Sequence, residues 1–350
     1  MKHLETSLAS VVLLALMAAA HPARASPDAF DVLTYNVYLR PTTLFKNGQA
    51  IRARLLARVL AGYDAIVFQE AFDDGARNKL LSGVHREYPH RTKVVGRDVG
   101  LNQDGGVVIV SKWPIIRQAQ RLFKKLCDGD DCKAQKGVSY ALIKKEGRCY
   151  HLFGTHVQAD DQKWQMRKLQ LGVLKQFIDS VHIRSNEPVM IAGDFNEDRY
   201  RGHYREMLDV LSAEHPPQAG PTYTFNHLTN DLNDSGQFRY YDYVLYSRNH
   251  LQPGGSVNEV RSFLSPSPWR EFFWEGWHRD LSDHYAVLGR FVFPPAPAGL
   301  PCPSGSTPAA ERCLLGCKET LDACIEEVSR PGGRLARICA QRAQRCRVAC

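Results

Sequence analysis

The sequence predicts an α/β fold in which helices cover a mixed β-sheet. Short apolar runs typical of core strands recur along residues 28–293, and fewer, longer segments with helical spacing of apolar residues lie between them. Because strands outnumber helices and the two kinds flank each other throughout, this arrangement fits better than an all-β sandwich. The 350 residues, 44% hydrophobic and 23% charged, suffice for one domain of about 270 residues and a small appendage.

Residues 1–25 are expected to be a signal peptide outside this fold. Lys2 precedes the apolar run Val11–Ala20, and Ala23-Arg24-Ala25 forms an A-x-A cleavage site. The run is too short for a membrane span, which takes ~20 apolar residues. We therefore expect a secreted mature protein whose ten cysteines form disulfides rather than a thiolate metal site.

Two helices and several strands can be placed inside residues 26–293. Gln49–Ala61 carries apolar residues at helical spacing with arginines on the other face, and Asp161–Ile183 shows the same period. Further strands are predicted at Gly105–Val110, Val138–Ile143 and Tyr240–Tyr246.

Polar residues stand at five points where an apolar run ends or begins. They are Asn36 after FDVL, Glu70 after DAIVF, His156 after YHLF, Asp194 and Asn196 after PVMIA, and Asp283 and His284 before YAVLGRFVF. Core strands would bring these side chains to one edge of a sheet. Carboxylate, amide and imidazole groups suit a hard divalent cation together with acid–base chemistry on a phosphate. The sequence has no Ser or Cys nucleophile motif.

A linker and a cysteine-rich tail follow the predicted domain. Residues 294–309 are rich in proline and should form an extended spacer. Within 310–350, two triplets of cysteines mirror each other about Pro331-Gly332, and each triplet would form a stripe on one face of a helix. This predicts an antiparallel helical hairpin with the disulfides Cys313–Cys350, Cys317–Cys346 and Cys324–Cys339. Cys127 and Cys132 could bridge locally, but the sequence does not fix their pairing or that of Cys149 and Cys302.

Seven sequence pieces, in order, resemble the endonuclease/exonuclease/phosphatase (deoxyribonuclease-like) superfamily. They are LTYNVYLRP (33–41), IVFQEAF (66–72), GGVVIVSKWPI (105–115), GTHVQADD (154–161), AGDFNED (192–198), YDYVLY (241–246) and LSDHYAV (281–287). The extended third, fourth and last pieces are most similar to bacterial secreted neutral sphingomyelinases. The resemblance implies a four-layer sandwich over residues 26–293, with two mixed β-sheets flanked by helices.

The resemblance also implies a metal-dependent phosphodiesterase that splits sphingomyelin into ceramide and phosphocholine. Mg²⁺, or Mn²⁺ or Co²⁺, would be held by Glu70, with Asn36 beside it as a metal-shell or phosphate contact. Asp194 would orient the attacking water, and Asn196 would donate to a phosphoryl oxygen. Asp74 and Asp104 resemble positions that hold a second, edge metal, although Gln103 stands where another acid is expected.

Proton transfer falls to histidines in this scheme. His284 is the predicted general base, because an imidazole titrates near neutral pH, and Asp242 would fix its tautomer. His156 would donate to the phosphate or the leaving oxygen, with Asp161 as its supporting carboxylate. Asp283 either points away from His284 along a strand or joins the metal shell where the backbone bends.

The substrate is suggested by an aromatic segment, PWREFFWEGWHRD (268–280), just before the Ser-Asp-His piece. Such a segment, with charged residues interleaved, fits an exposed hairpin that docks at a lipid interface. The predicted docking residues are Trp269, Phe272, Phe273, Trp274 and Trp277. A formal charge of +8 favours an anionic partner without choosing between lipid headgroups and nucleic acid. We expect the partner to be a membrane surface rather than nucleic acid. The alternative function is a secreted nuclease or an inositol-phosphate phosphatase of the same superfamily. A non-catalytic membrane-binding protein on this scaffold is the least favoured.

Overall fold

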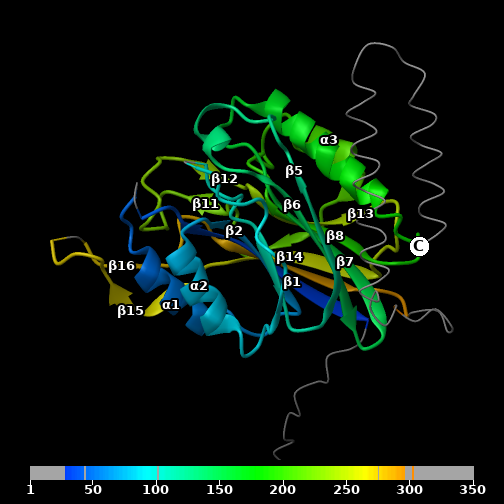
Figure 1. Ribbon diagram of the computed structural model, residues 1–350, viewed down its shortest axis with the longest axis horizontal. Coiled ribbons are helices and arrows are strands. Elements are labelled where there is room, and N and C mark those ends of the chain that lie inside the picture. The colour runs from blue at the N-terminus through cyan, green and yellow to red at the C-terminus, as the bar shows by residue number, and fades with distance from the viewer. Residues whose placement is uncertain (1–27, 43–44, 101, 275, 296–301, 303–350) are drawn as a thin grey trace, which may run out of the picture.

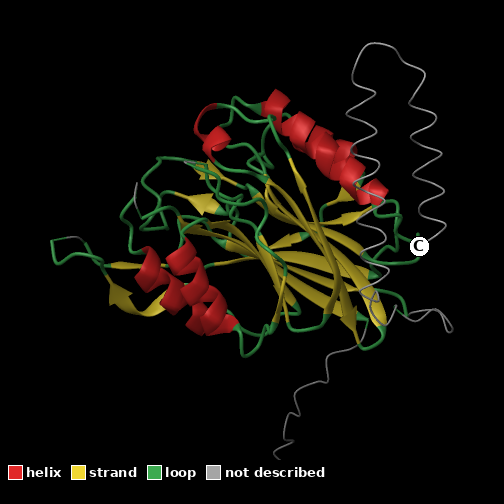
Figure 2. Ribbon diagram, in the orientation of Figure 1, coloured by secondary structure: helices red, strands yellow, loops and turns green. Residues whose placement is uncertain are grey.

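The computed structural model describes residues 28–42, 45–100, 102–274, 276–295 and 302. Two mixed sheets lie face to face, and helices cover their outer sides (Figures 1 and 2). This is the four-layer arrangement implied by the resemblance, and the predicted fold class is confirmed. The signal peptide and the three C-terminal disulfides predicted from the sequence lie outside the described residues.

The first sheet has seven strands. From one edge to the other they are β10 (Gln218–Ala219), β14 (Gly255–Arg261), β17 (Ala286–Val292), β1 (Ala29–Leu39), β2 (Ala65–Ala71), β4 (Val108–Ser111) and β3 (His90–Arg91). β1 and β2 run parallel, whereas β17 and β4 flank them in antiparallel pairing. The outer face is covered by α1 (Gln49–Val59) and α2 (Asp74–Val84), which pack against each other.

The second sheet has six strands. They are β5 (Ile115–Leu122), β6 (Gly137–Lys145), β7 (Arg148–His156), β8 (Val189–Asp194), β13 (Asp242–Ser247) and β9 (Ala213–Glu214). β7 and β8 are parallel, and β13 is antiparallel to β8. Helices α3 (Trp164–Ser180) and α4 (Tyr204–Leu211) lie on the outer side of this sheet.

Smaller elements complete the described chain. A 3₁₀ helix, η1 (Gly129–Lys133), and two two-stranded ribbons lie outside the main sheets. The ribbons are β11 (Phe225–Asn226) with β12 (Phe238–Arg239), and β15 (Leu264–Trp269) with β16 (His278–Asp280). Figure 1 shows the tip of the β15–β16 hairpin projecting well beyond α1, away from the body of the protein.

The main core lies between the two sheets. Side chains from β1 and β2, such as Phe30 and Val67, meet Tyr140 and Phe153 from β6 and β7, and all four are at most 1% exposed. A second core fills the space under α1 and α2. Burying apolar side chains on both faces explains why the central strands read as continuous apolar runs.

Two disulfides belong to the described residues. Cys127 bonds to Cys132 around η1, which is the local bridge that the sequence left open. Cys149 on β7 bonds to Cys302, 153 residues further along the chain. Cys302 lies inside the predicted linker, so this part of the linker is tied to the second sheet instead of acting as a free spacer.

Candidate functional site

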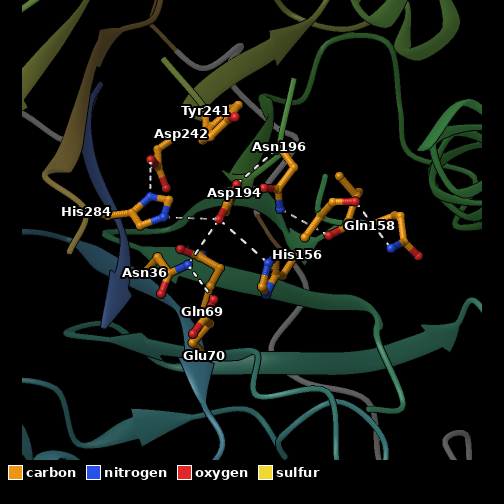
Figure 3. Close-up of polar contacts among 12 residues, drawn as sticks. Asn36, Gln69, Glu70, His156, Gln158, Asp194, Asn196, Tyr241, Asp242 and His284 are labelled. Carbon is orange, nitrogen blue, oxygen red and sulfur yellow. Dashed lines mark hydrogen bonds and ion pairs between the residues drawn. The ribbon is translucent and has the colours of Figure 1, made fainter. Parts of the chain in front are cut away.

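The predicted site residues converge because of how the central strands pair. Asn36 lies in β1, and Glu70 lies next to its partner Gln69 in the parallel strand β2. His156 at the end of β7 pairs with Asp194 at the end of β8. β13 runs antiparallel to β8, so Asp242 at its start also pairs with Asp194. The parallel strands and the start of the antiparallel strand β13 thus bring these side chains to the same edge of the two facing sheets (Figure 3).

Asp194 lies at the centre of this group. Its Oδ2 atom accepts a hydrogen bond from Asn36 Nδ2 at 3.0 Å and lies 3.6 Å from His156 Nε2 and 3.9 Å from His284 Nε2. Its Oδ1 atom accepts from the backbone amide of Asn196 at 2.9 Å. Burial and the charge of Asp242 raise the pKa of Asp194 to about 7.

Close approach of β7 and β8 brings His156 and Asp194 side by side. Gly193 pairs with Thr155 directly before them, and a Cβ atom at Gly193 would lie only 2.1 Å from the Thr155 carbonyl oxygen. Glycine is therefore required here, since any side chain would push the strands apart. In the GDFN motif, Gly193 therefore allows the two strands to approach closely, and Asp194 supplies the carboxylate of the site.

His284 and Asp242 form a buried dyad. His284 Nδ1 lies 2.8 Å from Asp242 Oδ2, which leaves Nε2 facing Asp194. Burial alone would lower the pKa of His284, but the charges of Asp242, Asp194 and Asp283 outweigh it and hold the pKa well above 6.5. The ring of Phe225 lies against the imidazole, with the two ring centres 4.9 Å apart.

Glu70 enters the site through a local break in the strand. Its φ of 53° is left-handed, so the side-chain alternation of β2 ends here, and Gln69 stays buried while Glu70 is half-buried at the cavity wall. Asn36 Nδ2 donates to Glu70 Oε1 at 3.1 Å and so joins this carboxylate to Asp194.

Asp283 lies in the same cavity. The chain bends at Leu281–Asp283, and Ser282 Oγ donates to the Asn36 carbonyl at 2.6 Å. Asp283 and His284 consequently both line the cavity, which is the bent alternative considered from the sequence. Burial and the neighbouring charge of Glu70 raise the pKa of Asp283 to about 6, although the charge of His284 opposes this.

A divalent cation fits the chemistry of these residues. Glu70, Asp194 and Asp283 line the cavity, and Asp242 lies behind His284. Burial and neighbouring carboxylates raise the pKa values of Asp194 and Asp283, and a cation beside them would offset this repulsion. Glu70 with Asn36 would hold the ion. Asp194, Asp242 and His284 also bring ligand atoms within 4.8 Å of one another. The dyad's own hydrogen bond occupies His284 Nδ1 and Asp242 Oδ2.

Lys136 is a site residue that the sequence analysis missed. Its ammonium group lies 3.3 Å from His156 Nε2, pairs with Asp131 at 2.8 Å and donates to the Val157 carbonyl at 3.0 Å. Burial and this neighbouring charge lower the pKa of His156 well below 6.5, so the imidazole is neutral. A lysine before the strand 137–145 carries no sequence signal; only the pairing of β6 with β7 reveals it.

The structure corrects the role predicted for Asp161. Its Oδ2 atom is bound by Arg239 at 2.8 Å and Arg201 at 3.1 Å, and its Oδ1 accepts from Tyr241 at 2.6 Å. The hydrogen bonds among the described residues do not join Asp161 to His156, whose Nε2 faces Lys136 and Asp194 instead. The prediction was wrong because residues five apart beyond a strand end diverge once the chain turns.

Asn196 lies close to its expected place. Its φ of 46° is left-handed, and its Nδ2 donates to the Val157 carbonyl at 3.3 Å at the wall of the cavity.

Asp74 and Asp104, predicted at an edge metal, lie apart from this group and are both paired with Arg77.

The predicted docking segment divides into buried and exposed parts. Trp269 is only 6% exposed, and its indole nitrogen donates to the Asp280 carbonyl at 3.0 Å, so its prediction as a docking residue was wrong. Phe272 is half-buried, and its ring stacks on Trp274 with 4.9 Å between ring centres. Phe273, Trp274 and Trp277 are 77%, 68% and 61% exposed.

The cavity between these groups has a volume of about 750 Å³. Glu70, His156, Asp194, Asn196, Asp283 and His284 line it, together with Lys136 and the aromatic rings of Phe225 and Tyr241. This volume suits a ligand of small-molecule size. The arrangement can bind a cation, hold a phosphate between positive and amide groups, and deprotonate a water.

The fold and this site define a class of protein. The model of the Endonuclease/Exonuclease/phosphatase family matches residues 33–284, and the chain belongs to this family. Within it the chain groups with the bacterial sphingomyelinase C proteins.

Three relatives show the extent of the similarity. A sphingomyelinase C of Leptospira interrogans is 38% identical over 78% of this chain but only 53% of its own length, so the chain spans about half of that protein. A sphingomyelinase C of Bacillus cereus is 35% identical over 74% of this chain and 88% of its own. The structure of a double mutant of beta toxin from Staphylococcus aureus with bound magnesium ions superposes with a TM-score of 0.70, at 32% identity, over 74% of this chain and 98% of that one.

Proposed function

We propose that this chain is a secreted, metal-dependent phosphodiesterase that hydrolyses sphingomyelin to ceramide and phosphocholine. The observation that carries the proposal is the buried His284–Asp242 dyad facing Asp194 across 3.9 Å, beside the Glu70–Asn36 pair. The sphingomyelinase C relatives support the substrate. The signal peptide predicted at residues 1–25 supports secretion, and none of the helices in the described part of the chain is long and apolar enough to cross a membrane.

In this proposal, His284 and Asp194 act on one water molecule. Their separation of 3.9 Å is too long for a direct hydrogen bond and leaves room for a water bound to both. Asp242 holds Nδ1 of His284, so Nε2 is the atom that takes the proton. The oxygen of this water attacks phosphorus, the bond from phosphorus to the ceramide oxygen breaks, and no covalent enzyme intermediate forms.

Negative charge on the phosphoryl oxygens is stabilised by positive and amide groups that line the cavity. Lys136 supplies a positive charge next to the neutral His156, and Asn196 supplies an amide donor. Mg²⁺, Mn²⁺ or Co²⁺ at Glu70 and Asn36 would neutralise further negative charge there. The ceramide oxygen takes up one proton from solvent as it leaves, and His284 later releases the proton it took from the water, so that one water is added across the bond between phosphorus and oxygen.

Docking on a membrane is assigned to the tip of the β15–β16 hairpin. Phe273, Trp274 and Trp277 present aromatic rings to solvent, and the guanidinium of Arg270 lies 4.3 Å from the centre of the Trp277 ring. Rings that combine an apolar body with a polar edge partition to the lipid–water interface. The hairpin is anchored to the protein by the Gly48 amide, which donates to Glu271 Oε2 at 2.6 Å.

Product analysis tests the proposal. The protein is incubated with sphingomyelin vesicles and Mg²⁺, with and without chelator, and in parallel with duplex DNA at low and high salt. We expect phosphocholine release that chelator abolishes, and no cleavage of DNA. Salt-sensitive DNA cleavage without phosphocholine would instead identify a nuclease, and binding to vesicles without any product would indicate a non-catalytic protein.

A further inference from the structure

An internal guanidinium lies where the sequence suggested a second metal ion. The carboxylates of Asp74, Asp98 and Asp104 bring oxygen atoms within 4.8 Å of one another. Arg77, only 9% exposed, pairs with Asp74 through Nη2 and with Asp104 at 2.8 Å through Nη1. Asp98 was not foreseen from the sequence; its Oδ1 accepts from the Asp104 amide at 2.9 Å.

The geometry of Asp104 favours this pairing over a cation. Asp104 is 1% exposed, and both of its oxygens accept hydrogen bonds, Oδ2 from Arg77 and Oδ1 from the Gly106 amide at 2.9 Å. A divalent ion in the cluster would have to displace a buried, permanently charged guanidinium or bind directly beside it. Gln103 adds no charge to the group. The residues present therefore do not fit a second metal.

Arg77 also holds the chain next to Glu70. Its Nη1 donates to the Ala71 carbonyl at 2.7 Å and to the Phe72 carbonyl at 3.4 Å, on the two residues after Glu70. The Ala71 amide is bound on the other side by the Gly106 carbonyl at 3.0 Å. Glu70 is itself in a left-handed conformation, which needs support from its surroundings. The hydrogen bonds of Arg77 and of Gly106 to the residues after Glu70 provide this support and so fix the direction of its carboxylate.

We propose that Arg77 is a built-in cation that replaces the second metal ion and positions Glu70, so that this protein binds one divalent cation. The proposal rests on the proposed function only in assigning the remaining ion to Glu70. It predicts that removing the positive charge of Arg77, while keeping a hydrogen-bond donor for Ala71, opens a second cation site at Asp74, Asp98 and Asp104.

The test is the number of Mn²⁺ ions bound at equilibrium, measured by electron paramagnetic resonance of the free ion without any substrate. We expect one ion for the wild type, for R77K and for the control K79A, whose exposed lysine lies on the same helix. R77Q should bind two ions, and R77Q/D104N one. Circular dichroism melts identify any variant that does not fold.

The wild type and D104N keep the proposal falsifiable even if R77Q does not fold. D104N should leave the wild-type count of one unchanged, because Asp104 holds Arg77 and not a metal. A wild type that binds two ions, of which D104N removes one, overturns the proposal, as does a folded R77Q that binds only one. E70Q should abolish the single site. The number of bound ions is measured without substrate, so the result does not depend on whether sphingomyelin is the substrate.

Discussion

Replacing the exposed tryptophans of the hairpin should weaken membrane binding without damaging the catalytic centre. The variant is W274A/W277A. An aromatic side chain can bury roughly 150–250 Å², and these two are 68% and 61% exposed. At about 25 cal/mol per Å², complete burial of the exposed part would contribute roughly 2–4 kcal/mol per ring.

Interfacial docking buries only part of each ring. We therefore expect a loss of about 1.4 kcal/mol per tryptophan, which is about tenfold in affinity for each and about 100-fold for the pair. Sedimentation with sphingomyelin vesicles measures the dissociation constant, and a water-soluble chromogenic phosphodiester measures turnover without a membrane. Turnover on the soluble substrate should stay within about twofold of wild type, because the rings lie outside the cavity-lining residues.

The matched control is L169A. Leu169 is 55% exposed on α3, which Figure 1 places on the opposite side of the protein from the hairpin. This control should bind vesicles like the wild type. Equal binding by W274A/W277A and wild type, or an equal loss in L169A, would refute the assignment of the docking surface.

Three further predictions address the catalytic groups and the scaffold. D242N should lower turnover by about 10²–10⁴ and shift the acidic limb of the rate–pH profile to lower pH, because losing a carboxylate that raises the pKa of His284 lets that pKa fall; an unshifted limb would show that His284 is not the base. K136M should lower turnover about 10–100-fold and raise the pKa of His156, which proton NMR can follow, since the lysine charge now holds that pKa down; an unchanged His156 titration would contradict this placement. R52L should lower the free energy of unfolding by about 3 kcal/mol or more, because Arg52 donates to the carbonyls of residues 37, 38, 47 and 281; thermal melts should show a fall that R54L, an exposed arginine on the same helix, lacks.

Much of the fold and the central group could be predicted because they follow from local pattern. The helices expected at 49–61 and 161–183 are α1 and α3 within a few residues, and the strand expected at 138–143 is the middle of β6. His156 and Asp194 could be placed at one edge because each ends an apolar strand, and the parallel pair β7–β8 aligns these ends. Asn36 follows an apolar run in the same way, although β1 continues to Leu39.

The rest depends on contacts between distant segments. Arg52 and Arg77 look like surface cations of amphipathic helices, yet each is buried and saturates backbone carbonyls or acids from far along the chain. Trp269 reads as one of a row of aromatics, but it fills the space beside Gly48, where a Cβ atom would lie 2.3 Å from its ring. The Cys149–Cys302 bond joins residues that only the completed sheet brings together.

Hydrolysis in ¹⁸O-labelled water measures the central claim most directly. The protein is incubated with sphingomyelin vesicles and Mg²⁺ in H₂¹⁸O, and the molecular masses of both products are measured by mass spectrometry. Attack on phosphorus by a water held between His284 and Asp194 predicts one ¹⁸O atom in the phosphocholine and none in the ceramide. Label in the ceramide hydroxyl, or phosphocholine without label, would contradict the mechanism derived from this site.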